Sequence, residues 1–522
     1  MKKTDLVLIL DFGSQYTQLI ARRSREFKVY SEIHPYSTNL KKLVKEKSSL
    51  YSVKGVILSG GPSSVLAKDS PKISKTDFEY LVKNKIPVLG ICYGFQLLCH
   101  MLKGKLHVSG QRHYGHTKIY IFGDSLIFKG IKNQLNVWMS HGDSADQLPD
   151  KFRPTSKSID SVICSFENEK MKIYGLQFHP EVHHTESGKI ILYNFLFSVC
   201  NVKNLFEPES FIGTKTEEIK KIAGKNKVIC ALSGGVDSSV AAVLVSRAIG
   251  ENLICIHIDN GLMRKDESRK VTELFKRHYK LNLVFVNASE LFLNNLKGVV
   301  DPEEKRKIIG KTFIEVFEKE AKKIKNAKFL VQGTLYPDVI ESVSFKGPSS
   351  TIKTHHNVGG LPLKMKLKLI EPFRELFKDE VREIGLKLNL PGNFVFRHPF
   401  PGPGLAIRIL SDVTKEKLSL LKEADDIYMT ELKKFNLYDK IWQAFAVLLP
   451  VQTVGVMGDE RSYENVIALR AVTSTDGMTA DFYGFDKEFL THISTKIINS
   501  VKGVNRVVYD ISSKPPATIE WE

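Results

Sequence analysis

The stretch SGGVDSS, residues 233–239, decides the fold of the central part of this chain. It lies between an apolar, strand-like run at 228–232 and a helix-like run at 240–249 that Gly250 closes. Glycines and hydroxyl side chains at a strand-to-helix turn allow backbone N–H groups to surround an anion at the helix N-terminus. The turn lacks the lysine with which a Walker A loop holds terminal phosphates. We therefore interpret it as a loop for the pyrophosphate unit of ATP, against the alternative of an ordinary Gly-Ser turn.

The surrounding pattern predicts an α/β protein with several domains, as expected for 522 residues. A strand at 227–232, a helix at 238–249 and a strand at 253–259 form the βαβ unit from which a doubly wound parallel sheet is built. Strand-like and helical runs also alternate before residue 203 and predict another, mainly parallel α/β sheet. The segment HPFPGPG at 398–404 is too rich in proline and glycine for a helix and marks a boundary. The predicted domains are 1–203, 204–397 and a smaller α+β domain at 398–522.

Composition narrows the class of protein. Hydrophobic residues make up 42% and charged residues 26% of the chain, which is typical of a globular protein. The apolar runs are much shorter than the roughly 20 residues of a membrane span. The N-terminal residues lead directly into a predicted strand and show no signal-peptide pattern. We therefore expect a cytoplasmic protein that has no membrane partner. Six cysteines without a CxxC pair argue against a zinc ribbon and a disulfide framework.

The net charge of +18 suits either nucleic acid or anionic small molecules. The sequence has no zinc finger, aromatic RNA-binding signature or basic tail. We therefore favour nucleotides over nucleic acid as the anionic partners.

A nucleophile is predicted at Cys92. The motif GICYGFQ at 90–96 follows a strand and opens a helix, which exposes the side chain at the turn and places the thiol near a helix N-terminus. A free cysteine is only a few per cent thiolate at neutral pH and needs a base. His179 and Glu181 follow the strand at 173–178, and their spacing of two puts both side chains on one side. Glu181 can hold one imidazole nitrogen while the other takes the proton of Cys92.

The turn SGGP at 59–62 ends another strand and could offer backbone N–H groups to a tetrahedral intermediate. Each of the three motifs is weak alone, but all lie at the carboxyl ends of predicted parallel strands, where α/β sites form. Together they resemble the class I glutamine amidotransferases, whose cysteine attacks the side-chain amide of glutamine and releases ammonia. The resemblance implies that Gly61, Tyr93 and Gln96 serve the oxyanion and the glutamine.

The turn at 233–239 resembles the PP-loop of the N-type ATP pyrophosphatases. Both resemblances fit the family of glutamine-hydrolysing GMP synthases, which convert XMP to GMP. That likeness extends over GTLYPD at 333–338, KTHHN at 353–357, residues 397–408, GVMGD at 455–459 and the tail DISSKPPATIE at 510–520. The tail is the most specific of these motifs.

The resemblance implies the remaining site residues. Magnesium, with ATP as co-substrate, would be held by Asp237, Asp338 and Glu341, because Mg²⁺ prefers carboxylates and phosphate oxygens. The expected ATP-binding residues are Ser233, Gly234, Gly235, Val236, Asp237, Ser238, Ser239, Asp259, Gly261, Gly333, Asp338, Glu341, Lys353, His355 and His356. The expected XMP-binding residues are Arg306, Gln443, Arg506, Lys514, Ile519 and Glu520. The third domain is expected to form a homodimer.

The residues leave two other functions open. The chain could be another PP-loop enzyme, such as an NAD synthetase or a tRNA-modifying adenylase, although the KPPATIE tail at 514–520 distinguishes it from both. It could also bind nucleic acid through its positive charge, with a steep dependence on salt. Intact motifs at every expected position disfavour that second alternative.

Overall fold

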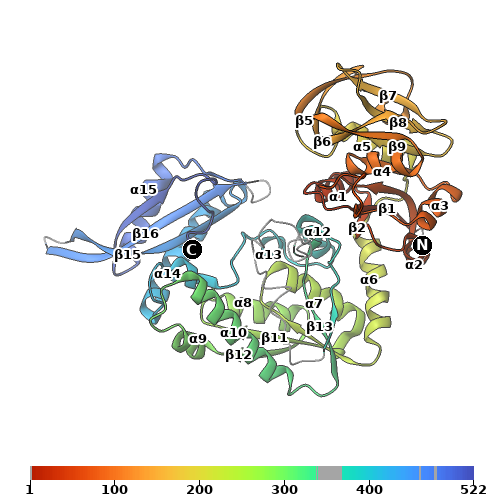
Figure 1. Ribbon diagram of the computed structural model, residues 1–522. Helices are drawn as coiled ribbons and strands as arrows, with labels where there is room; N and C mark the ends of the chain where they lie inside the picture. Colours follow the sequence, from red (N-terminus) through yellow and green to blue (C-terminus); the bar gives the residue numbers. More distant parts are fainter. Residues whose placement is uncertain (1–2, 337, 339–366, 458–459, 475–478) are drawn as a thin grey trace. The chain divides into compact units, whose positions relative to one another are not determined.

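A computed structural model describes residues 3–336, 338, 367–457, 460–474 and 479–522, with backbone alone at 108–114, 457 and 460 (Figure 1). Four predicted site residues lie outside the described residues: Glu341, Lys353, His355 and His356. The chain forms two compact units, Met1–Thr214 and Lys215–Glu522. The three domain boundaries derived from the sequence stay a prediction.

The first unit is built on one mixed sheet with the strand order β2-β1-β3-β4-β9-β8-β7-β5-β6. Its strands are β1 (Thr4–Asp11), β2 (Tyr30–Pro35), β3 (Tyr51–Leu58), β4 (Val88–Ile91), β5 (Lys105–Ile121), β6 (Gln134–Gln147), β7 (Arg153–Ser158), β8 (Ile163–Asn168) and β9 (Ile173–Leu176). The strands from β2 to β9 in this order pair in parallel, which confirms the predicted α/β class. Beyond β9 the pairing is antiparallel, an extension that the sequence patterns did not indicate.

A helix follows each parallel strand of the first unit in the chain. These helices are α1 (Thr17–Glu26), α2 (Leu40–Lys47), α3 (Lys75–Lys83), α4 (Tyr93–Met101) and α5 (Gly188–Asn194), and α6 (Pro208–Ala223) runs into the second unit. Local chemistry sets where some of them begin, because the side chains of Asn39 and Ser74 accept hydrogen bonds from the first turns of α2 and α3. Strands β1 and β4 are almost wholly buried, and so is the second half of β3.

The second unit contains a parallel sheet with the order β12-β11-β10-β13-β14. Its strands are β10 (Lys227–Ala231), β11 (Leu253–Asp259), β12 (Asn282–Asn287), β13 (Ala327–Val331) and β14 (Lys368–Ile370). The helices around it are α7 (Val236–Ile249), α8 (Glu267–Glu273), α9 (Ser289–Asn295), α10 (Pro302–Ala321), α12 (Lys378–Lys387) and α13 (Gly392–Val395). α7 packs beside α12 and α10 packs beside α9, as in a doubly wound sheet.

A second sheet follows the Pro/Gly-rich segment. It comprises β15 (Gln443–Met457), β16 (Glu460–Thr473), β17 (Asp481–Phe482) and β18 (Val504–Asp510), with the helices η5 (Gly404–Arg408), α14 (Lys415–Lys434) and α15 (Lys487–Ser500). β15 and β16 form a long antiparallel hairpin, and β18 pairs with β16 in parallel. One apolar core joins the two sheets of this unit, since Ile229 and Ile256 belong to the same buried cluster as Leu448 and Ile493.

The described residues include no helix that is both long and apolar enough to cross a membrane. All six cysteines are free and buried.

Candidate active sites

Cys92 lies in a strained turn between β4 and α4. Its backbone has φ 52° and ψ −101°, a conformation that a residue with a Cβ atom rarely adopts. Two glycines make the turn possible: a Cβ atom on Gly94 would clash with the Leu58 carbonyl, and one on Gly90 would clash with the Gly94 carbonyl. The Cys92 N–H donates to the Leu176 carbonyl of β9 at 2.7 Å, so the backbone of this turn is held at the carboxyl end of the parallel strands.

His179 and Glu181 form the expected pair beside Cys92. The distance between His179 Nδ1 and Glu181 Oε1 is 2.8 Å, and both side chains are buried. Burial would by itself lower the pKa of His179, but the charge of Glu181 and the hydrogen bond with Cys92 outweigh it and raise that pKa well above its usual value. Glu181 therefore favours the protonated form of this imidazole.

Two further residues position this pair, although nothing in their sequence context indicated it. The ring of Tyr16 packs edge-on against His179, with centroids 5.1 Å apart. Arg23 Nε donates to the Glu181 carbonyl at 3.1 Å. Tyr16 immediately precedes α1 and Arg23 lies within it, so this helix contributes to the orientation of the pair.

The turn after β3 lies directly against His179 and Tyr93. A Cβ atom on Gly60 would be 3.1 Å from His179 Cε1, and one on Gly61 would be 3.3 Å from the Tyr93 ring. The Tyr93 hydroxyl donates to the Pro71 carbonyl at 2.5 Å, and Gln96 Nε2 donates to the Asp143 carbonyl at 3.0 Å. The side chains of Tyr93 and Gln96 thus bind main-chain carbonyls, and the roles of Gly61, Tyr93 and Gln96 toward glutamine stay predictions.

We expect the Glu181→Gln variant to hydrolyse glutamine about 10²-fold more slowly, because the cationic imidazole loses the charge that stabilises it. The pKa of His179 should fall, since the carboxylate raises it in the native protein. The basic limb of the pH profile of glutaminase kcat should therefore move to lower pH. Steady-state kinetics from pH 6 to 10 measure both effects, and an unchanged basic limb would contradict this role of Glu181.

The loop at 233–239 has the geometry of an anion-binding turn. Gly234 has φ 83°, and α7 begins at Val236 immediately after Gly235. The Ser233 hydroxyl accepts the Gly235 N–H at 3.1 Å and lies 2.9 Å from the Ser238 hydroxyl. Gly333, which follows β13, touches the start of α7 so closely that a Cβ atom would be 3.0 Å from the Asp237 carbonyl carbon. The N-terminal N–H groups of α7 thus line a compact turn, as phosphate binding requires.

Asp237 and Asp338 are neighbours at the base of this loop. Burial raises the pKa of Asp237, and the charge of Asp338 raises it further. Nearby cations lower this pKa, but the net shift is upward. Asp237 Oδ1 is buried with no hydrogen-bond partner among the described residues. A buried, unpartnered carboxylate beside another carboxylate is stabilised by a hard cation, so these residues fit Mg²⁺. Within the described part of the chain no group of three or more His, Cys, Asp or Glu residues could hold a metal, and the third predicted ligand, Glu341, lies outside that part.

The turn after β11 is also fixed by hydrogen bonds. Asp259 Oδ1 accepts the N–H of Gly261, whose φ is 75°. Lys422 of α14 donates to the Gly261 carbonyl at 2.6 Å, so α14 contacts the turn predicted to hold adenosine. Arg397 donates to the Gly234 carbonyl of the loop and pairs with Glu267 at 3.0 Å. Neither Lys422 nor Arg397 is among the site residues predicted from the sequence, although Arg397 opens the quoted segment 397–408.

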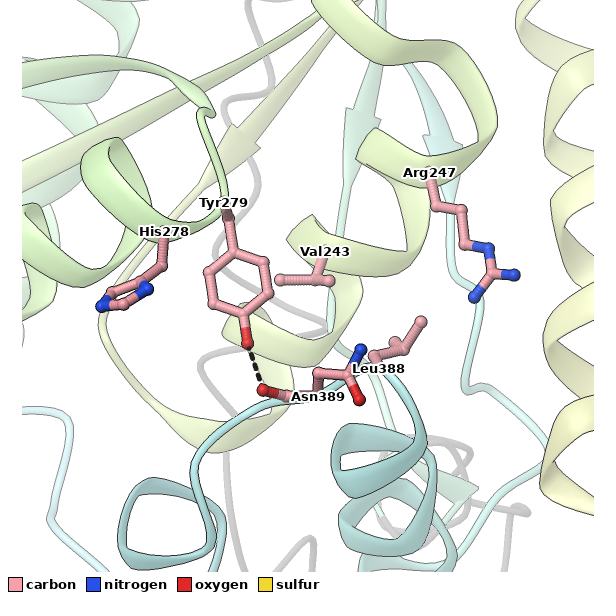
Figure 2. A pocket seen from close by; sticks show the side chains of 6 residues that line it. All are labelled: Val243, Arg247, His278, Tyr279, Leu388 and Asn389. Atoms are coloured by element: carbon pink, nitrogen blue, oxygen red, sulfur yellow. Dashed lines mark hydrogen bonds between the residues drawn. The ribbon is translucent and has the colours of Figure 1, made fainter.

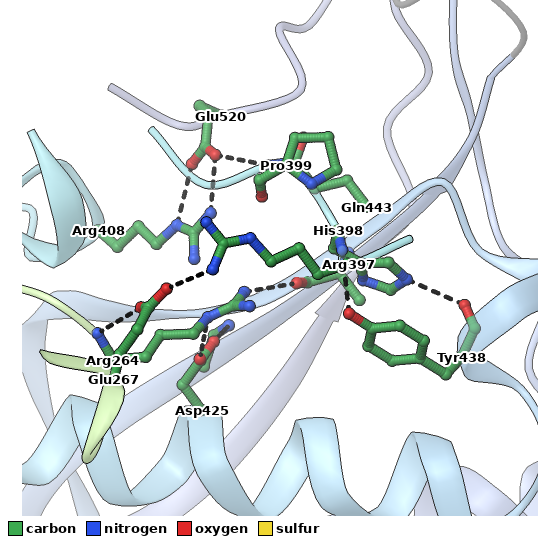
Figure 3. Close-up of polar contacts among 12 residues, drawn as sticks. Arg264, Glu267, Arg397, His398, Pro399, Arg408, Asp425, Tyr438, Gln443 and Glu520 are labelled. Carbon is green, nitrogen blue, oxygen red and sulfur yellow. Dashed lines mark hydrogen bonds and ion pairs between the residues drawn. The ribbon is translucent and has the colours of Figure 1, made fainter. Parts of the chain in front are cut away.

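Gln443 and Glu520, both predicted to bind XMP, are in contact (Figure 3). Gln443 Nε2 donates to Glu520 Oε1 at 2.7 Å, and the same carboxylate accepts two hydrogen bonds from Arg408. Arg408 belongs to the quoted segment 397–408, but its residue type alone did not indicate which partner it binds. Figure 3 shows these residues converging from η5, β15 and the C-terminal tail.

The other four predicted XMP residues lie along the same unit. Arg306 of α10 donates to the Glu522 carbonyl at 2.6 Å, and Arg506 of β18 donates to Thr453 at 3.3 Å. The backbone of Lys514 pairs with that of Ala480. Ile519 is buried in an apolar cluster with Phe445 and holds the tail against β15. Their roles toward XMP stay predictions.

Arg470, which was not predicted from the sequence, holds the main chain of the tail. It is fully buried and donates to the carbonyls of Ser512 and Thr518 at 2.5 and 3.2 Å. It also pairs with Asp510 at 3.3 Å. The tail is therefore fixed through its main chain, which allows the side chain of Glu520 to take a defined position.

Comparisons with known proteins agree with the two units. Residues 8–199 match the family "Glutamine amidotransferase class-I", residues 209–299 match "NAD synthase" and residues 430–521 match "GMP synthase C terminal domain". The chain is 56% identical over 518 residues to "GMP synthase [glutamine-hydrolyzing]" of Brachyspira hyodysenteriae. It is 56% identical over 523 residues to the protein so named from Chlorobaculum tepidum, and 55% identical over 522 residues to that from Rhizobium etli.

Each of these alignments covers 99% of this chain and 99% of the relative. Together with the Cys92 turn and the loop at 233–239, they establish that the chain belongs to the family of glutamine-hydrolysing GMP synthases.

Proposed function

We propose that the first unit hydrolyses glutamine with Cys92 as the nucleophile. Cys92 gives its thiol proton to His179 and its sulfur attacks the side-chain amide carbon, and backbone N–H groups of Gly61 and Tyr93 stabilise the oxyanion. His179 donates a proton to the departing ammonia, and a water molecule then hydrolyses the thioester to release glutamate. The observation that carries this proposal is the buried His179–Glu181 pair beside the strained Cys92 turn.

In the second unit the C2 oxygen of XMP attacks the α-phosphorus of ATP, and pyrophosphate leaves. Ammonia then attacks C2, and AMP departs with the former C2 oxygen. The N–H groups of the loop at 233–239 bind the pyrophosphate and stabilise the charge that develops on it. Asp237 and Asp338, with Glu341, would hold Mg²⁺, which neutralises phosphate charge when bound. Lys353, His355 and His356 are proposed to add positive charge at the same phosphates.

The nucleotide XMP is proposed to bind at the C-terminal tail. Glu520 and Gln443 suit the N–H and carbonyl groups of its ring edge. Arg306, Arg506 and Lys514 suit its phosphate, because arginine and lysine bind phosphate oxygens well. Ile519 contributes an apolar contact beside Glu520.

The adenylation step has a direct isotopic test. When XMP labelled with ¹⁸O at C2 is converted with ATP and ammonium salt, the label should appear in the phosphate group of AMP. Mass spectrometry of the AMP measures this transfer. Recovery of the label in water or in inorganic phosphate would rule out attack of the C2 oxygen on the α-phosphorus.

We further propose that the protein is a homodimer joined through the second sheet of the second unit. Apolar side chains are exposed along its strands and the start of the tail: Val451, Val454, Val456, Tyr463, Val508 and Ile511. Val456 is 75% exposed and Tyr463 is 65% exposed, which is costly for a surface that faces water. Partly apolar sheet faces of this kind are covered when two copies pair.

The Val456→Glu variant should therefore dissociate into monomers at concentrations where the native protein is dimeric. Analytical ultracentrifugation measures the mass of both proteins. Val300→Glu, a change at an exposed valine outside this sheet, is the matched control and should leave the dimer intact. A native protein that sediments as a monomer would refute the proposed dimer.

We also propose that the enzyme works in the cytoplasm. Its six cysteines are all free, and Cys92 must remain a thiol to attack glutamine. A reducing compartment keeps such thiols unpaired.

A further inference from the structure

Arg408 is a fully buried cation whose place is fixed by packing. Its guanidinium carbon lies 4.2 Å from the ring centroid of Phe445 and 5.2 Å from that of Phe400. The short helix η5 that carries it is pressed against Leu262: Gly404 has φ 65°, and a side chain there would clash with the Leu262 carbonyl. The guanidinium thus lies over two aromatic rings and is held by protein packing alone.

This buried cation holds the carboxylate of Glu520 with two hydrogen bonds (Figure 3). Arg408 Nε lies 3.1 Å from Oε2, and Nη2 lies 2.8 Å from Oε1. The planar fork of arginine fixes the plane of a carboxylate, which a lysine cannot do. Glu520 keeps 20% of its side chain exposed, whereas that of Arg408 is wholly buried, so only the carboxylate is presented outward.

The hydrogen bonds to the Glu520 carboxylate leave an acceptor position free and fix the direction in which it points. A carboxylate has about four lone-pair positions. Oε1 accepts from Arg408 and from Gln443, and Oε2 accepts from Arg408. Counting these donors of the described chain, about one acceptor position remains free, on Oε2. Such a position suits an N–H group at the edge of a purine ring.

Stability does not explain an arginine at this place. A buried ion pair contributes little compared with apolar side chains of the same volume. Nη1 of Arg408 is also buried without a hydrogen-bond partner among the described residues, which is unfavourable. An arginine here is better explained by the orientation that it imposes on Glu520.

We infer that Arg408 is a positioning residue for XMP recognition, acting through Glu520. This inference rests on the proposed contact between Glu520 and XMP. It assigns Arg408 no contact with the substrate itself, because its exposed fraction is zero.

The test is a double-mutant cycle on XMP binding, with ammonium salt as the nitrogen donor so that glutamine hydrolysis does not contribute. Glu520→Gln and Arg408→Met should each raise the KM for XMP about tenfold, the value of one charged hydrogen bond. The KM for ATP and the kcat at saturating XMP should stay near the native values. The double variant should raise the KM for XMP no further than Glu520→Gln alone, since Arg408 acts through that carboxylate.

Arg408→Lys keeps the charge but loses the fork, and it should also raise the KM for XMP, which provides a second variant if Arg408→Met folds poorly. The matched control is Arg25→Met in the first unit, because Arg25 is also buried with its guanidinium carbon 4.2 Å from a ring centroid, that of Tyr30. This control should leave the KM for XMP unchanged.

Two outcomes would overturn the inference: a native KM for XMP in both Arg408 variants, or effects of Arg408→Met and Glu520→Gln that multiply in the double variant. An unchanged KM for XMP in Glu520→Gln would instead refute the proposed contact between Glu520 and XMP. The failures of the inference and of the proposed contact are therefore distinguishable.

Discussion

The Cys92→Ala variant should lose glutamine-dependent GMP formation by at least about 10⁴-fold, because it lacks the sulfur that forms the thioester. Its ammonium-dependent GMP formation should remain close to native. Cys92 lies in the first unit, whereas the loop at 233–239 and the Glu520 site lie in the second. Parallel assays with glutamine and with ammonium salt, under otherwise identical conditions, measure the two activities.

Cys99→Ala is the matched control for this prediction. Cys99 is buried on α4, the helix that follows Cys92, and burial raises the pKa of its thiol to about 11, so it is unreactive at neutral pH. This variant should retain glutamine-dependent synthesis. Loss of both activities in a folded Cys92→Ala protein would contradict the assignment of glutamine hydrolysis and nucleotide chemistry to separate sites.

The Asp237→Asn variant should lose synthesis with either nitrogen donor by at least about 10³-fold, since a neutral amide cannot hold Mg²⁺ against the pyrophosphate. Its glutaminase activity should persist, because Asp237 lies in the second unit. The carboxylate is buried beside Asp338, and Oδ1 has no partner among the described residues, so the loss of charge should not destabilise the fold. Measurement of pyrophosphate release, with Mg²⁺ varied, separates a loss of metal binding from a loss of chemistry.

Asp266→Asn provides the control in the same unit. Asp266 precedes α8 and its side chain is 48% exposed, so its neutralisation should leave synthesis unchanged. Native synthesis by Asp237→Asn with a native dependence on Mg²⁺ would contradict the assigned metal site.

The parts of the sites that are local in sequence could be predicted from it. The alternation of Gly90, Cys92 and Gly94 between a strand and a helix predicts a tight turn, and the structure shows why each glycine is needed there. The spacing of two between His179 and Glu181 puts both side chains on one side of the chain, and this predicted the contact that the structure shows. The helix was predicted at 238–249, but α7 begins at Val236. Its first turn includes Val236 and Asp237, which the pattern assigned to the loop.

Long-range partners could not be predicted in this way. Arg408 and Glu520 are 112 positions apart, and residue type alone does not indicate that one holds the other. The antiparallel extension of the first sheet was missed because the pairing of β5 with β6 and β7 depends on which strands meet after folding. Likewise, the link from Arg397 to the Gly234 carbonyl spans 163 positions. Such contacts follow from the packing of the whole unit rather than from local pattern.

The most direct test of the account is the product balance of the native protein supplied with XMP, ATP, Mg²⁺ and glutamine. Chromatography should resolve GMP, AMP and pyrophosphate in equal amounts, without ADP, because the reaction passes through an adenylated nucleotide. Formation of GMP with an equal amount of ADP would contradict the account, since it would mean that ATP donates its terminal phosphate instead.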